Sequence, residues 1–160
     1  MVEPRVNKQS GGEVFGVPVT LSVAAQSSTL PIIRAVAEQA LFGGDWAIDD
    51  VADLRLGIDE ICSQLIASAR PDRALTVVLD IGEQTAVCRM STLVDPRHEI
   101  ATTGFGWHVV GTVTDAQSID YADTREGRLV TVRIAKNRSD IDDLGSVVGE
   151  CGERASGTLE

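Results

Sequence analysis

The sequence predicts an α+β domain of two layers, in which helices cover one face of a mostly antiparallel sheet. Strand-like segments occur in groups, and two helical segments follow the first of them without an intervening strand. Short polar connections join the strands in pairs, as in β-hairpins. Grouped strands beside consecutive helices favour this architecture. The strict strand–helix alternation of a doubly wound parallel sheet is missing.

The first elements are predicted from periodicity and from helix-start residues. Residues 17–24 alternate apolar and small polar side chains, which predicts a strand. The hydroxyl run 27–29, followed by Pro31, predicts the start of a helix that reaches about Phe42. Its apolar stripe comprises Ile32, Ile33, Val36, Ala40 and Leu41. This stripe either packs in the core or contacts a second copy of the chain.

The second helix is predicted over residues 49–69, with Asp49 or Asp50 as its cap. Apolar residues recur there at steps of three and four, and Pro71 cannot continue the helix. Strands at 74–81 and 85–93 follow, and their short connection predicts an antiparallel hairpin.

Residues 95–103 show no periodicity and are expected to form a loop. A helix is predicted at 107–113, then strands at 117–121 and 128–135. We expect a flexible N-terminal arm at 1–14, one domain at 15–136, and a polar, poorly ordered tail at 137–160 with a short helix near 140–148.

Composition narrows the classes of partner. The chain has 160 residues and a formal net charge of −10. That charge argues against direct nucleic-acid binding and against an anionic membrane surface, and it is compatible with a basic protein partner. No apolar run reaches the ~20 residues that span a bilayer, and the first residues do not resemble a signal peptide. Cys62 and Cys88 lie in apolar patterns, so we expect reduced core thiols and a cytoplasmic protein.

The second helix carries the first candidate site. Asp59 and Glu60 are adjacent carboxylates, and Gln64 shares a helix face with Glu60 because the two are four residues apart. A carboxylate and an amide on one face could hold a metal–phosphate group. They could equally form a solvated acidic surface, the commoner role of such pairs.

The second candidate site is the segment Thr102-Thr103-Gly104-Phe105-Gly106, which precedes a helix. Two glycines at a helix start let backbone N–H groups approach a phosphate, and the helix dipole favours the anion. The alternative is a flexible loop with a tight helix cap. The chain contains no Walker A sequence, no GxGxxG motif and no GxSxG turn.

In order along the chain, these features resemble the Bergerat-type (GHKL) ATPase fold. More narrowly, they are similar to the small anti-sigma factor serine/threonine kinases, in a divergent branch of mycobacterial type. The resemblance rests on LRLGIDEICSQLIASA, on the hairpin after it and on GFGWHVVGTVTDAQSIDYADTREGRLVTVRI. It covers roughly residues 15–136. In this resemblance the helix at 51–69 corresponds to the family's N-box helix.

The resemblance implies a regulator of transcription that works by partner switching. Such proteins hold a stress or sporulation sigma factor away from RNA polymerase, and an anti-anti-sigma protein captures and disarms them. Many phosphorylate that antagonist with ATP and Mg²⁺. The resemblance assigns the catalytic role to Glu60, weak magnesium binding to Gln64, and nucleotide binding to Gln64, Thr103, Gly104 and Gly106. It also implies a homodimer formed through the first helix and the edge strand.

Two positions depart from the family pattern. Gln64 stands where the family has asparagine, so the amide is one methylene farther from the backbone. The family's strand after the hairpin continues into DxGxG, whose aspartate receives the adenine amino group. Met90 or Ser91 stands near that place, and Asp95 comes later without glycines. These departures keep open an alternative function, a non-enzymatic binding regulator with a vestigial ATP cleft.

Overall fold

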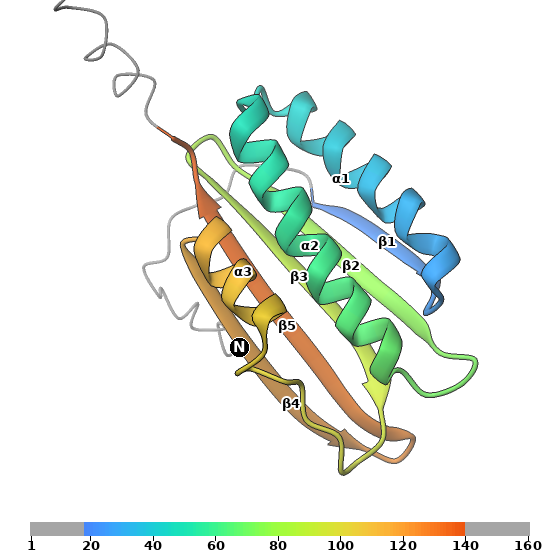
Figure 1. Cartoon of the computed structure of the whole chain (residues 1–160). Coiled ribbons are helices and arrows are strands. Elements are labelled where there is room, and N and C mark those ends of the chain that lie inside the picture. Colours follow the sequence, from blue (N-terminus) through green and yellow to red (C-terminus); the bar gives the residue numbers. More distant parts are fainter. Residues whose placement is uncertain (1–17, 140–160) are drawn as a thin grey trace, which may run out of the picture.

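A five-stranded antiparallel sheet is the framework of the protein, as seen in a computed structural model that describes residues 18–139 (Figure 1). The strand order is β1-β2-β3-β5-β4, and every neighbouring pair is antiparallel. The strands are β1 (Val19–Ala24), β2 (Ala74–Ile81), β3 (Thr85–Val94), β4 (Ala116–Thr124) and β5 (Gly127–Asn137). The edge positions therefore belong to β1 and β4.

Three α-helices cover one face of this sheet: α1 (Leu30–Gly43), α2 (Ile48–Ser68) and α3 (Phe105–Val113). A short 3₁₀ turn, η1 (Ser27–Thr29), precedes α1. In Figure 1, α2 runs between the other two helices, with α1 on the β1 side and α3 on the β4 side. The predicted two-layer α+β class is confirmed.

The core lies between the helices and the sheet. Alternate residues of β2, β3 and β5 point into it, including Leu75, Met90 and Val132, each 0% exposed. The middle helix contributes most, with Leu54, Ile58, Ile61, Cys62 and Leu65 buried beneath it. The prediction that Cys62 and Cys88 are core thiols is confirmed. Cys151 lies outside the described residues.

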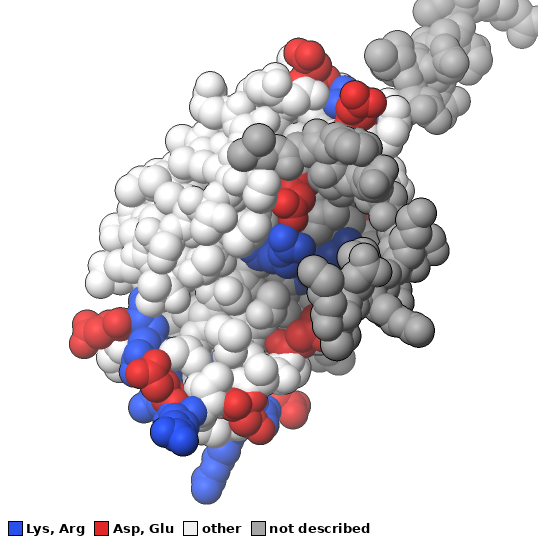
Figure 2. All heavy atoms as spheres, turned by 180° about the vertical axis from the view of Figure 1, so that it is seen from behind, with Lys and Arg blue, Asp and Glu red and all other residues white. Residues whose placement is uncertain are grey.

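The opposite face of the sheet has no helix over it among residues 18–139. Seen from behind, most of the surface on this side is uncharged (Figure 2). Arg89 and Arg133 are Cα partners across β3 and β5 on this face, and Arg89 bonds to Asp80 at 2.5 Å. No described helix has the length and apolar composition needed to cross a bilayer.

Most predicted elements are present, with informative shifts at their ends. The capping prediction for α2 is wrong: Ala47 is its N-cap, and Asp49 and Asp50 lie within the first turn. Asp50 is 1% exposed, because its carboxylate accepts hydrogen bonds from Ser139 instead of capping the helix. The α1 stripe is shifted too, since Ile33, Ala37 and Leu41 are buried while Ile32 is 51% exposed.

The predicted start of the C-terminal tail, at residue 137, is too early. Asn137 ends β5, and Arg138 donates from its guanidinium to the carbonyl oxygens of Glu83, Asp45 and Gly44. The same guanidinium lies 4.9 Å from the Trp46 ring centroid. These bonds fix Arg138 to two loops, and Ser139 bonds to Asp50 on α2, which the polar composition did not indicate. The arm at 1–14 and the short helix near 140–148 lie outside the described residues.

Candidate functional site

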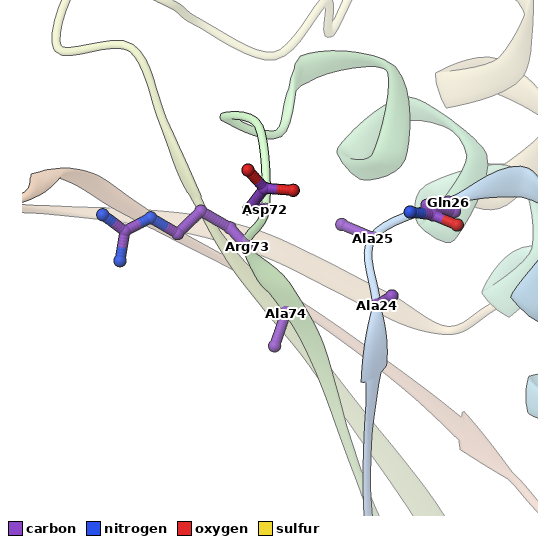
Figure 3. Close-up of a pocket in the computed structure, with 6 residues that line it drawn as sticks. All are labelled: Ala24, Ala25, Gln26, Asp72, Arg73 and Ala74. Carbon is purple, nitrogen blue, oxygen red and sulfur yellow. The ribbon is translucent and has the colours of Figure 1, made fainter.

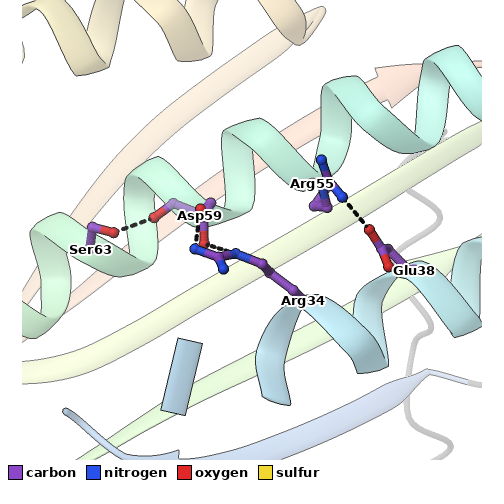
Figure 4. A network of polar contacts seen from close by, with 5 residues as sticks. All are labelled: Arg34, Glu38, Arg55, Asp59 and Ser63. Carbon is purple, nitrogen blue, oxygen red and sulfur yellow. Dashed lines mark hydrogen bonds and ion pairs between the residues drawn. The ribbon is translucent and has the colours of Figure 1, made fainter. Parts of the chain in front are cut away.

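The adjacent carboxylates Asp59 and Glu60 face different helices. Asp59 turns toward α1 and accepts two hydrogen bonds from Arg34, at 2.8 and 2.7 Å (Figure 4). The bond and the charge of Asp59 raise the pKa of Arg34. A second pair, Arg55 with Glu38 at 2.6 Å, joins the same two helices. Asp59 is therefore a structural residue, and the solvated-face interpretation does not describe it.

Glu60 turns the other way, toward α3. Gln64 Nε2 donates to Glu60 Oε1 at 3.2 Å, so the predicted pair does form on one helix face. A Cβ atom added to Gly106 would overlap Glu60 Oε1 and lie 2.5 Å from Glu60 Cδ and 2.9 Å from Gln64 Nε2. The structure thus brings Glu60, Gln64 and Gly106 into one packed cluster between α2 and α3.

The two glycines of the GFG segment differ in their surroundings. The helix begins at Phe105, two residues before the predicted start, so Gly106 lies inside its first turn. Gly104 is the N-cap, and nothing lies within 4 Å of a Cβ added to it. Thr103 and Gly104 are exposed and belong to the open approach to the helix. Of the two glycines, Gly106 is the one that lies against the side-chain ends of Glu60 and Gln64.

An oxygen in this cluster lacks a protein partner. Gln64 Oε1 is buried and accepts no hydrogen bond from the described residues. An unpaired buried acceptor is costly, so its retention is typical of a site that receives a water or a ligand. Carboxylate and amide oxygens are ligands that Mg²⁺ accepts, usually together with substrate phosphates. The donor set of Glu60 and Gln64 therefore fits the phosphate side of a magnesium–nucleotide complex.

The base side of the expected nucleotide cleft does not fit as well. Met90 is 0% exposed in the core and Ser91 points to the opposite face of the sheet, so neither can replace a carboxylate there. β3 runs to Val94, one residue beyond the prediction, and Asp95 directly follows it. Asp95 Oδ1 accepts a hydrogen bond from the Arg97 N–H at 3.0 Å, in its own turn. Asp95 is thus the aspartate that continues the strand, and Pro96 replaces the glycine-rich pattern after it.

The loop between β3 and α3 is held to the domain at its centre. Ile100 is 6% exposed, and its backbone N–H donates to the Tyr121 hydroxyl oxygen on β4 at 3.0 Å. The Arg128 guanidinium lies 5.5 Å from the Tyr121 ring centroid. Sequence analysis missed this anchor. The one sign of it in the sequence is Ile100, a large apolar residue in an otherwise polar loop.

Two hollows have linings that do not include Glu60. One, of about 340 Å³, is formed where β1 ends and β2 begins, by small residues together with Gln26, Asp72 and Arg73 (Figure 3). The other, of about 380 Å³, lies beside α3 and β4, and the predicted nucleotide-binding residues Thr103 and Gly104 line it together with Gln117. Among the described residues, no group of three or more His, Cys, Asp or Glu side chains could hold a metal ion.

Comparison with known proteins yields a relative. The chain is 37% identical over 97 residues to the protein named anti-sigma-F factor RsbW from two Mycobacterium tuberculosis strains, CDC 1551 and H37Rv. The chain is therefore similar in sequence to an RsbW-type anti-sigma factor. The match covers 61% of this chain and 58% of each relative, so it spans little more than half of the curated proteins. No family model matches the sequence.

This relationship confirms the resemblance that the N-box-like helix and the GFG segment indicated. The matched proteins are mycobacterial, as the sequence suggested. The roles of Glu60, Gln64, Thr103, Gly104 and Gly106 in nucleotide chemistry stay predictions. What the geometry adds is that three of these five residues are in contact.

Proposed function

We propose that this protein is an anti-sigma factor that sequesters an alternative sigma factor of the stress or sporulation type. The observation that carries this proposal is the 37% identity over 97 residues to proteins named anti-sigma-F factors. The net charge of −10 is consistent with it, because an acidic surface attracts the basic DNA-contacting regions of a sigma factor. An anti-anti-sigma protein then releases the sigma factor by capturing this chain.

The test is direct capture of sigma factors. The tagged full-length chain is mixed with each purified alternative sigma factor from its own organism, and run-off transcription by the matching RNA polymerase holoenzyme is measured. We expect one sigma factor to bind and its transcripts to disappear, while transcription with the housekeeping sigma factor continues. Failure to bind any alternative sigma factor would contradict the proposal.

The protein could act in two ways, with or without phosphorylation of its antagonist. In the first, ATP and Mg²⁺ bind weakly and Glu60 assists phosphate transfer to a serine or threonine of the antagonist. In the second, the cleft is vestigial and the protein acts by binding alone. The donor set of Glu60 and Gln64 favours the first version, whereas the lost glycines after Asp95 favour the second.

Calorimetric titration with Mg-ATP separates the two versions. Micromolar binding that disappears in Glu60→Ala supports the first, as does label transfer from γ-labelled ATP to the antagonist. Absence of binding while sigma-factor capture persists supports the second. Gln84→Ala, an exposed change in the turn between β2 and β3, serves as the control for surface substitution.

We also propose that the protein forms a homodimer through the outer face of α1 and the edge of β1. Arg34 and Glu38 are the charged residues of α1, and both pair with α2. The outer face therefore presents uncharged residues, among them Ile32, 51% exposed, and Phe42, 44% exposed. We expect Ile32→Lys to shift the mass in light scattering from dimer to monomer. Phe105→Lys, an exposed apolar position on α3, is the matched control.

A further inference from the structure

The exposed apolar side chains of this protein are concentrated on the helical layer. Among the described residues, six large apolar side chains are exposed, and five of them belong to α1, α2 or α3. Two of the five, Ile48 and Leu56, are 75% and 47% exposed and lie on α2, with the exposed Ala52 midway between them. Residues four apart share a helix face, so these three form a continuous apolar ridge along the outer side of α2.

Neither neighbouring helix covers this ridge. α1 meets α2 at the two ion pairs described above, and α3 meets it at Glu60. The ridge stays exposed along α2, which is the middle helix of the layer in Figure 1. A continuous apolar row on the outer side of a helix is typical of a surface that packs against a further element.

The chain leaves the described part of the structure beside the start of the ridge. Ser139, the last described residue, donates from its backbone N–H to Asp50 Oδ2 at 3.0 Å and from its hydroxyl to Asp50 Oδ1 at 2.6 Å. Asp50 lies in the first turn of α2, two residues after Ile48. The segment that follows Ser139 therefore starts at the end of α2 where the ridge starts.

The sequence after Ser139 has the pattern of a helix with one apolar side. Its large apolar residues recur at steps of three and four, at Ile141, Leu144 and Val148. Asp142 and Asp143 lie on the opposite side of such a helix, and Ser139 has the spacing to Asp142 of a capping box. At 1.5 Å per residue, a helix from 141 to 148 is about 11 Å long, close to the length of about 12 Å for the ridge.

We propose that residues 140–148 form a helix that docks along the ridge, so that this segment of the chain covers the outer side of α2. A helix of about nine residues is marginal in water by itself, and burial of its apolar side against Ile48 and Leu56 stabilises it. Its two acids then face solvent, away from the exposed Asp49 that borders the ridge. The contact does not depend on the proposed function. A partner protein that binds the outer side of α2 has to displace this segment.

Hydrogen exchange of the full-length protein, followed by NMR, tests this contact against a synthetic peptide of residues 139–160. We expect the amides of 143–148 to exchange about tenfold or more slowly in the protein than in the peptide. Ile48→Asp should reduce this protection to less than about twofold, and an aspartate at the first position of α2 is compatible with the helix. Phe105→Asp is the matched control and should keep the protection, because Phe105 is the first residue of α3 and is 82% exposed.

A second variant, Leu56→Gln, removes apolar contact without adding charge and should also reduce the protection. Equal exchange in the protein and in the peptide would overturn the proposal, as would full protection in Ile48→Asp or in Leu56→Gln. Light scattering then identifies the other occupant. A lower mass in Ile48→Asp than in Phe105→Asp assigns the ridge to a second copy of the chain, and equal masses leave it to a different protein. Exchange in β2 and β3 reports whether each variant is folded.

Discussion

α2 contacts its two neighbours in opposite ways. Toward α1 it offers matched charges, with Asp59 paired to Arg34 and Arg55 paired to Glu38. Toward α3 it offers Glu60 and Gln64, which bond to each other beside Gly106, and the amide oxygen of Gln64 is buried without a partner. The α1 contact is chemically complete, and the α3 contact is incomplete. Helix contacts that serve structure alone satisfy their polar groups, so the difference locates the candidate site on the α3 side.

The largest expected losses of stability come from replacing buried apolar residues of α1 and α3. Ile33 on α1 is 2% exposed and has two further buried residues beside it on that helix, whereas Val110 on α3 is the sole fully buried residue of its helix. Ile33→Ala should lower the free energy of global unfolding by about 2–5 kcal/mol. Val110→Ala removes two carbon atoms, which costs about 1.6 kcal/mol of transfer free energy together with a term for the cavity left behind.

The two variants should also differ in kind. In denaturant titrations monitored by hydrogen exchange, Ile33→Ala should speed exchange across the whole domain. Val110→Ala should act chiefly on the α3 amides, because this helix buries a single residue and we expect it to open locally before the domain unfolds. Uniform acceleration by both variants would show that the two contacts belong to one cooperative unit, and the contrast between them would be lost.

Two buried thiols, Cys62 on the core-facing side of α2 and Cys88 on β3, should make the stability of the fold depend on pH. Burial raises the pKa of the Cys62 thiol to about 12, and burial raises the pKa of Cys88 well above its usual value. The unfolded chain releases these protons at lower pH than the folded chain, so the thiols favour folding fully below the unfolded pKa. Stability should then fall as pH rises from about 9 toward 12, by about 1 kcal/mol per pH unit for Cys62.

Urea unfolding at several alkaline pH values measures this slope. Replacing Cys62 by alanine should flatten it, although the stability near neutral pH also falls because the site loses its sulfur atom. An unchanged slope in Cys62→Ala would assign the alkaline loss to other groups. The folded protein should meanwhile resist alkylation at both buried thiols, since the reactive thiolate is scarce.

How far the sequence could predict this contrast depends on the distance that each feature spans. Periodicity identified α2, the hairpins and the placement of Glu60 beside Gln64, because these depend on residues that are close in the chain. The pairing of Asp59 with Arg34 joins residues 25 apart in sequence, and the bond from Ile100 to Tyr121 joins residues 21 apart. Neither partner has a local pattern that predicts the other.

The same reasoning explains the errors at element ends. Asp50 is a residue type that commonly caps helices. Its carboxylate instead accepts a hydrogen bond from Ser139, which is 89 residues away in the sequence. Gly106 was read as part of a loop that precedes a helix. Its role in packing depends on the side chain of Glu60 from another helix, which one segment of sequence cannot show.

The ion pairs between α1 and α2 should contribute less to the free energy of unfolding than the buried apolar residues of α1 do. Arg34 is 42% exposed and Asp59 27% exposed in their side chains, so water screens their attraction. Asp59→Ala should lower the melting temperature by less than Ile33→Ala, and the exchanged pair Arg34→Asp/Asp59→Arg should recover part of the loss. A double variant that is worse than both single variants would mean that the orientation of the pair, rather than its charge, matters.

The smallest effect, and the most informative for the α3 contact, concerns the unpaired oxygen of Gln64. Gln64→Met keeps the length of the side chain and removes the buried acceptor, so stability should stay equal or rise by up to about 1 kcal/mol. Gln84→Met, at an exposed position in the turn between β2 and β3, is the control for the change in composition. If Gln64→Met destabilises the protein clearly, the donor bond to Glu60 is worth more than the unpaired oxygen costs. A stabilising result together with weaker Mg-ATP binding would instead mean that the glutamine is kept for a ligand at the expense of the fold.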